Sequence, residues 1–202
     1  LYRWQRKMIV SRSEIDKFPV VIIGPPRSGS NVVCRHIATD LNLPWFNDIT
    51  YVDKSEFVKF SEFIQTSDQY VVKFHAMDLL DYPELLIDKI NNNQSYNIKI
   101  VRKNKVEQLA SVYLAEIRKT YTYDRLNLDM YADEIIKIEK MRLARCLNRM
   151  HKNYLELENL KVSFDKVVIY EDYIYDSGSV LTPKPKNYDD LLNLITQDTR
   201  NI

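Results

Sequence analysis

Residues 20–31 have the sequence VVIIGPPRSGSN. The β-branched apolar run Val20–Ile23 is typical of a strand that is buried on both faces of a parallel sheet. Gly24 ends this run, and apolar residues at helical spacing follow from Ser30 to about Leu41. Backbone N–H groups and the positive end of a helix dipole meet where such a loop enters a helix, so this stretch predicts an anion-binding site.

The rest of the chain predicts alternating strands and helices. Strands are predicted at 70–74, 97–101 and 166–170, and helices at 105–119, at 132–160 as one long helix or a broken pair, and at 189–195. This alternation favours a three-layer α/β fold, in which helices flank a parallel sheet of about four or five strands. A length of 202 residues suits one domain, residues 1–202. Ligands bind beyond the carboxyl ends of the strands in such sheets, so the residues after Ile23, Val72 and Val101 are candidates for a site.

The loop after the first strand has the glycine spacing of G-x-x-x-x-G-K-[ST], the phosphate loop of nucleotide triphosphatases. Ser30 stands at the lysine position and Asn31 at the position of the hydroxyl that ligates magnesium, while the cation is Arg27 instead. The comparison predicts a P-loop-like fold with a phosphate cradle that suits metal-free group transfer. A tight turn that binds nothing is the alternative.

The segment PPRSGSN, residues 25–31, resembles the 5'-phosphosulfate loop of sulfotransferases, P-[KR]-[ST]-G-[ST]-[ST]. The resemblance implies that Arg27 contacts the phosphosulfate of 3'-phosphoadenosine 5'-phosphosulfate (PAPS). It also implies that the donor's oxygens are held by backbone amides and side chains of Ser28, Gly29, Ser30 and Asn31. Asn31 departs from the usual Ser or Thr but still donates a hydrogen bond.

A second motif follows the third predicted strand. Arg102 at the strand end and Ser111 in the next helix resemble the 3'-phosphate site of sulfotransferases, and the planar fork of an arginine suits a phosphate. The surrounding string VRKNKVEQLASVYLA looks closest to the trehalose-2-sulfotransferase type. Tyr170-Glu171-Asp172, at the end of the fourth predicted strand, resembles a YED motif near the nucleotide site, which adds Tyr170 to the nucleotide-binding residues.

The general base has two candidates. Lys73-Phe74-His75 resembles the K-x-H motif of cytosolic sulfotransferases, in which the histidine is the base and the lysine lies beside the sulfuryl group. A histidine titrates near neutral pH, as such a base requires. The trehalose type uses a carboxylate after the first helix, and here only Asp48 lies near that place. We favour His75 over Asp48, with a purely structural role for His75 as the alternative.

Together these motifs predict a PAPS-dependent sulfotransferase that releases 3'-phosphoadenosine 5'-phosphate (PAP), needs no metal and acts on a hydroxyl-bearing acceptor, with a saccharide as one candidate. A P-loop small-molecule kinase and a sulfotransferase-like nucleotide binder without turnover are the alternatives. The net charge of +1 gives no reason to expect a nucleic-acid partner, and no apolar run of membrane-spanning length is present. Two distant cysteines, Cys34 and Cys146, favour free thiols in a reducing, cytoplasmic setting. The oligomeric state is left open.

Overall fold

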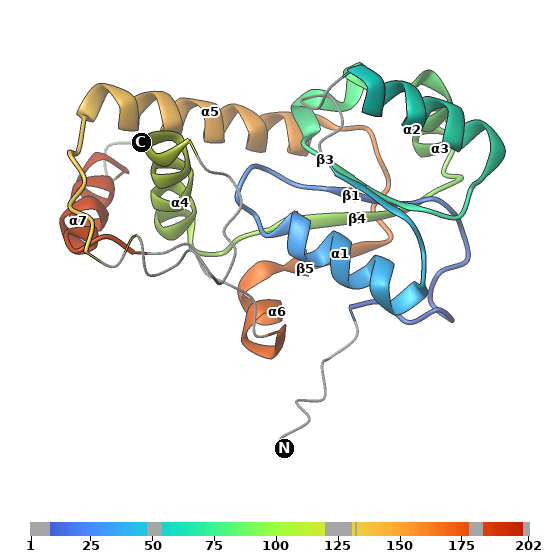
Figure 1. Cartoon of the computed structure of the whole chain (residues 1–202), viewed down its shortest axis with the longest axis horizontal. Coiled ribbons are helices and arrows are strands. Elements are labelled where there is room, and N and C mark those ends of the chain that lie inside the picture. Colours follow the sequence, from blue (N-terminus) through green and yellow to red (C-terminus); the bar gives the residue numbers. More distant parts are fainter. Residues whose placement is uncertain (1–8, 48–53, 120–130, 132, 178–183, 200–202) are drawn as a thin grey trace.

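The computed structural model describes residues 9–47, 54–119, 131, 133–177 and 184–199. Its centre is a sheet of five parallel strands in the order β2-β3-β1-β4-β5 (Figure 1). The strands are β1 Val20–Ile23, β2 Trp45–Asn47, β3 Val71–Phe74, β4 Tyr96–Val101 and β5 Lys166–Ile169. The prediction of an α/β fold with a parallel sheet of four or five strands is therefore confirmed, with five strands.

Helices cover both faces of the sheet (Figure 1). They are α1 Ser30–Leu41, α2 Lys54–Thr66, α3 Glu84–Asn91, α4 Lys105–Arg118, α5 Lys140–Asn159, α6 Tyr170–Ser177 and α7 Tyr188–Thr199, with a 3₁₀ helix η2 at Ala76–Asp81. None of the described helices has the length and apolar character needed to cross a membrane.

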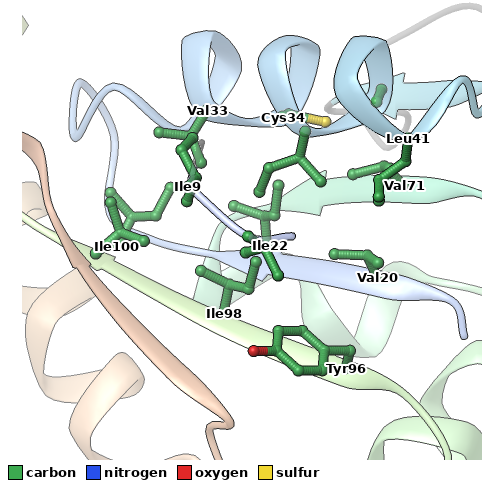
Figure 2. Packing of buried hydrophobic residues seen from close by; sticks show 14 of the residues in the cluster. Ile9, Val20, Ile22, Val33, Cys34, Leu41, Val71, Tyr96, Ile98 and Ile100 are labelled. Atoms are coloured by element: carbon green, nitrogen blue, oxygen red, sulfur yellow. The ribbon is translucent and has the colours of Figure 1, made fainter. Parts of the chain in front are cut away.

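Strand β1 shows why the sequence forms these layers. Val20 and Ile22 pack toward α1, in the cluster drawn in Figure 2, whereas Val21 and Ile23 pack into a cluster with side chains of α2, α3 and α5. Alternate residues of a strand point to opposite faces, and all four of these side chains are fully buried. A third cluster joins α4, α5 and α7.

Strands β1 and β4 lie side by side, and the chain leaves them in opposite directions. From β1 it crosses α1 to β2 at one edge of the sheet, and from β4 it passes α4 and α5 to β5 at the other. Ligands in open parallel sheets bind at such a switch point, outside the carboxyl ends of the two strands. The predicted phosphate loop and the segment after Val101 therefore belong to the same place in the fold.

Two of the predicted elements were wrong at their ends. The helix predicted at 132–160 begins only at Lys140, because Asn187 uses both of its amide groups on the backbone N–H and C=O of Ile136, at 3.0 and 2.9 Å. The strand predicted at 166–170 ends at Ile169, and Tyr170 begins α6. The short edge strand β2 and the helices α2 and α3 were not predicted.

Candidate active site

The loop between β1 and α1 turns sharply. Arg27 and Gly29 both have left-handed backbone angles, with φ of 58° and 84°. The turn is closed by a hydrogen bond from the backbone N–H of Ser28 to the carbonyl of Pro25 at 3.2 Å. Gly24 lets the loop lie close to β4, since a Cβ at that position would be 3.0 Å from the carbonyl oxygen of Ile100.

Gly29 is required for two separate reasons. Its positive φ disfavours a side chain, and a Cβ there would lie 1.9 Å from a ring carbon of Tyr170. The buried Tyr170 ring thus lies directly against the loop. Burial raises the pKa of the Tyr170 phenol, which keeps it neutral, although the charges of Arg102 and Arg27 act in the opposite direction.

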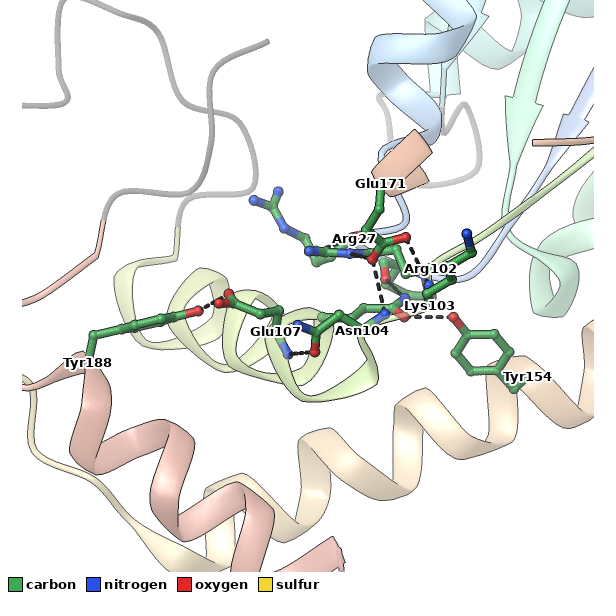
Figure 3. A network of polar contacts seen from close by, with 10 residues as sticks. Arg27, Arg102, Lys103, Asn104, Glu107, Tyr154, Glu171 and Tyr188 are labelled. Atoms are coloured by element: carbon green, nitrogen blue, oxygen red, sulfur yellow. Dashed lines mark hydrogen bonds and ion pairs between the residues drawn. The ribbon is translucent and has the colours of Figure 1, made fainter. Parts of the chain in front are cut away.

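Two arginines, Arg27 and Arg102, meet at this loop (Figure 3), and the helical Ser111 contacts the first of them. The Nε of Arg27 donates to Ser111 Oγ at 2.9 Å, and Nη1 of Arg102 donates to the carbonyl of Arg27 at 3.4 Å. The Arg102 guanidinium also stacks over Tyr170, 4.7 Å from the ring centroid. The structure therefore brings together four residues that were predicted from separate motifs: Arg27, Arg102, Ser111 and Tyr170.

Glu171 is a member of this network that the sequence interpretation did not single out. Its carboxylate accepts from the backbone N–H groups of Lys103 and Asn104, at 2.9 and 3.1 Å, and from Nε of Arg102 at 3.4 Å (Figure 3). Burial raises the pKa of Glu171, but the two N–H groups and Arg102 lower it by more, so the pKa lies below its ordinary value. The charged carboxylate orients Arg102 and lies at the N-terminus of α4, where the helix dipole favours it.

A second residue that was missed is Gln108. It is completely buried, and its Nε2 donates to the carbonyl of Pro26 at 2.8 Å, while its Oε1 accepts from the hydroxyl of Tyr154 at 2.6 Å. This side chain connects the loop through α4 to α5. A glutamine in a helix carries no sequence signal for such a contact.

The N-terminus of α1 carries no local compensation for its dipole. Its N-cap is Gly29, which has no side chain, and the first turn holds no acidic residue. α4 differs, because Asn104 caps it by accepting from the N–H of Glu107 at 3.0 Å. The Oγ of Ser28 is buried under the loop, where it has no hydrogen-bond partner among the described residues, and it would lie 2.8 Å from a Cβ at Gly24. An anion at this helix end would meet free N–H groups and a nearby guanidinium.

Lys73 and His75 lie together at the end of β3. Nδ1 of His75 is 2.8 Å from the carbonyl oxygen of Gly24, which can only accept, so Nδ1 carries the proton. Nε2 is 3.3 Å from the ammonium of Lys73, which can only donate, so Nε2 presents its lone pair. The Lys73 side chain is buried. A neutral imidazole fits this geometry, with Nδ1 bonded to the first residue of the phosphate loop and Nε2 bonded to Lys73.

Asp48, the competing base, lies outside the described residues. The second described histidine of the N-terminal half, His36, contacts the hydroxyl of Tyr173, which joins α1 to α6.

Within the described ranges, no group of three or more His, Cys, Asp or Glu side chains is placed to hold a metal ion. What the site offers is positive charge from Arg27 and Arg102, the N-terminus of α1, and a neutral histidine next to a buried lysine. Such a site can bind an anion and accept a proton beside it.

No protein-family model and no curated protein matches the sequence. Among solved structures, shikimate kinase from Bacteroides thetaiotaomicron has a TM-score of 0.43 at 7% identity, over 90% of this chain and 97% of the kinase. Mouse sulfotransferase SULT7A1, complexed with PAP, has a TM-score of 0.42 at 13% identity, over 94% of this chain and 65% of the sulfotransferase. An uncharacterized protein from Eubacterium ventriosum has a TM-score of 0.37 at 14% identity, over 88% of this chain and 99% of that protein. At this level of similarity none of the three carries an argument about what this chain does.

Proposed function

We propose that the protein is a sulfotransferase, which moves the sulfuryl group of PAPS to a hydroxyl of an acceptor. One observation carries the proposal: Lys73 and His75 are attached through Gly24 to a loop that carries Arg27, and both Arg102 and Ser111 contact Arg27. The proposal takes His75 as a base beside an anion site at this loop. That pairing suits transfer of an anionic group to a hydroxyl, which must lose its proton.

PAPS has two anionic groups, the 5'-phosphosulfate and the 3'-phosphate. The candidate site has two sets of hydrogen-bond donors that could hold them. The N-terminus of α1 and Arg27 would hold the 5'-phosphosulfate. Arg102 would hold the 3'-phosphate, because Glu171 and the carbonyl of Arg27 use only two of its N–H groups among the described contacts, and a guanidinium has five. Ser111, which accepts from Arg27, would link the two ends.

In the proposed reaction the acceptor oxygen attacks sulfur as the bond from sulfur to the bridging oxygen breaks. The acceptor's proton goes to Nε2 of His75, and the electron pair of the broken bond stays on the phosphate of PAP. Arg27 and Lys73 stabilise the negative charge that grows on the bridging and sulfuryl oxygens. Nδ1 of His75 keeps its hydrogen bond to Gly24 throughout, which holds Nε2 in position.

The test is calorimetry in EDTA with adenosine 3',5'-bisphosphate, AMP and ATP. We expect the bisphosphate to bind best, because Arg102 adds charge-assisted bonds that contribute about 10-fold or more in affinity. Arg102→Ala should reduce the advantage of the bisphosphate over AMP. Arg145→Ala, which removes an exposed arginine from α5, is the matched control and should leave it unchanged.

Turnover is tested with PAPS that carries a radiolabelled sulfuryl group and a panel of hydroxyl acceptors, with saccharides included. Transfer of label that persists in EDTA would support the proposal. ATP binding that requires magnesium, with no preference for the bisphosphate, would refute it and favour a small-molecule kinase. If the bisphosphate bound but no acceptor received the label, the protein would be a nucleotide-binding protein and not a sulfotransferase.

A further inference from the structure

A hollow lies on the face of the sheet opposite α1. It has a volume of about 360 Å³, within the range of small-ligand sites. Its walls come from the end of β4, the first residue of α4 and one side of α5. Among its lining residues are Lys99, Lys105, Leu147, Met150, Tyr154 and Leu155.

The hollow is separate from the candidate active site. Ile98 and Ile100 of β4 pack toward α1, so their alternate neighbours Lys99 and Val101 face α5. Gln108 lies between the two places, bonded to Pro26 of the phosphate loop on one side and to Tyr154 of the hollow on the other. Figure 3 shows Tyr154 reaching from α5 toward the start of α4.

Two lysines of the hollow have aromatic neighbours and no carboxylate partner within ion-pair distance among the described residues. The ammonium of Lys105 lies 3.3 Å from the centroid of the Tyr154 ring, and that of Lys99 lies 5.7 Å from the centroid of Phe164. Lys103, two residues from Lys105, pairs with Asp172 at 2.9 Å. The hollow thus holds two lysines outside any ion pair among the described residues, and one carboxylate, that of Glu158, also lines it.

The pKa of Lys105 is lowered to about 8, chiefly by burial and also by the charges of Arg102 and Lys99. Glu171 and Glu158 raise it, by less than burial lowers it. An anion bound in the hollow would restore part of the interaction that the ammonium loses with water. His151 on α5 also lines the hollow.

Apart from Glu158 and His151, the remaining wall is apolar. Leu147, Met150 and Leu155 lie along one side of α5, and Leu155 is 45% exposed in spite of its size. A ligand that fits this surface has a flat apolar body to cover the leucines and the tyrosine ring, and a negative charge for the lysines.

We propose that this hollow binds a small amphipathic anion, an aromatic ring system that carries one carboxylate or sulfonate. The proposal stands independently of the sulfotransferase proposal, because none of the residues assigned to donor binding lines the hollow.

The probe is 1-naphthoate, compared with the uncharged 1-naphthylmethanol and the cationic 1-naphthylmethylammonium, by calorimetry on the whole chain. We expect naphthoate to bind best. Lys105→Met should weaken naphthoate by about 10-fold and leave naphthylmethanol unchanged, since a charge-assisted contact is lost. Lys103→Met removes a lysine two residues away and should change neither ligand. Leu155→Ala should weaken both.

The pH dependence gives a second readout. A carboxylate ligand stays ionised above about pH 5, so a rise from about pH 7 to about pH 9.5 changes mainly the protonation of Lys105. Naphthoate binding should weaken over this range in the wild type and not in Lys105→Met. Equal binding of the three naphthalenes, or equal losses in Lys103→Met and Lys105→Met, would overturn the proposal. The proposal would also be overturned if naphthoate did not bind and the protein formed a dimer that Leu155→Asp dissociates. That pair of results would assign the hollow to a second copy of the chain.

Discussion

The contact between Gly29 and Tyr170 makes a quantitative prediction for Gly29→Ala. A residue with a Cβ costs about 1–2 kcal/mol in the left-handed region that Gly29 occupies, at φ 84°. The new methyl would also lie 1.9 Å from a carbon of the Tyr170 ring, and such overpacking costs about 1–3 kcal/mol as neighbours shift. We expect Gly29→Ala to lower the free energy of unfolding by about 2–5 kcal/mol, measured by urea unfolding followed by circular dichroism.

A double-mutant cycle separates the two causes. In a Tyr170→Ala background the clash disappears and only the backbone strain remains, so Gly29→Ala should cost about 1–3 kcal/mol less than it does in the wild type. Tyr170→Phe is the matched control, because it keeps the ring and should leave the cost of Gly29→Ala unchanged. Effects that add to within about 0.5 kcal/mol in the Tyr170→Ala background would refute the argument that the ring excludes a side chain at position 29.

Arg27→Ala should keep the fold and reduce sulfuryl transfer by about 100-fold or more, measured as label transfer from PAPS, because it removes charge from beside the transferred group; near-normal transfer in a folded variant would contradict its assigned role. His75→Ala should lose about 10²–10⁴ in rate with bisphosphate binding retained, and Asp48→Ala should lose far less, since we assign the base to His75; the reverse order in single-turnover rates would assign the base to the carboxylate. Glu171→Gln should lower the free energy of unfolding near neutral pH by about 1–3 kcal/mol. The folded pKa of Glu171 lies below its ordinary value, so the stability that the carboxylate contributes is complete above about pH 4.3 and is lost as the pH falls through the folded pKa. In urea unfolding, the free energies of the wild type and Glu171→Gln should therefore converge in acid and not in alkali. Burial raises the pKa of the Cys146 thiol to about 12, so iodoacetamide should label it at mildly alkaline pH only after urea is added, and rapid labelling of the folded protein in mass spectra would contradict its buried position.

The sequence predicted the fold where local and long-range preferences agree. Val20–Ile23 is apolar at every position, because this central strand is covered on both faces. Helix α1 begins at Ser30, as expected from the loop glycine before it. Strand β2 was missed because it has three residues, lies at the edge of the sheet and leaves Trp45 39% exposed, so it has neither an apolar run nor a clear alternation.

The positions of the site residues could be predicted, but their contacts could not. Arg27 and Ser111 are 84 residues apart, and only the crossing of the chain at the switch point brings them within 2.9 Å. His75 and Gly24, which are 51 residues apart, meet because β3 pairs directly with β1. A sequence motif identifies the residues that follow a single strand. The order of the strands decides which strand ends are neighbours.

The change from strand β5 to helix α6 at Tyr170 explains how the loops after β1 and β4 are held together. A continued strand would have pointed Tyr170 and Glu171 to opposite faces of the sheet. Because Tyr170 instead begins α6, the two side chains project about 100° apart, from one helical turn. The tyrosine ring can then lie against Gly29 on the loop after β1, while the glutamate carboxylate binds the backbone N–H groups after β4. Arg102 contacts both of these residues, so neither loop can shift without breaking a contact of this guanidinium. The geometry of the candidate anion site, at two strand ends, thus depends on residues that follow a third strand, β5, and supply none of the positive charge.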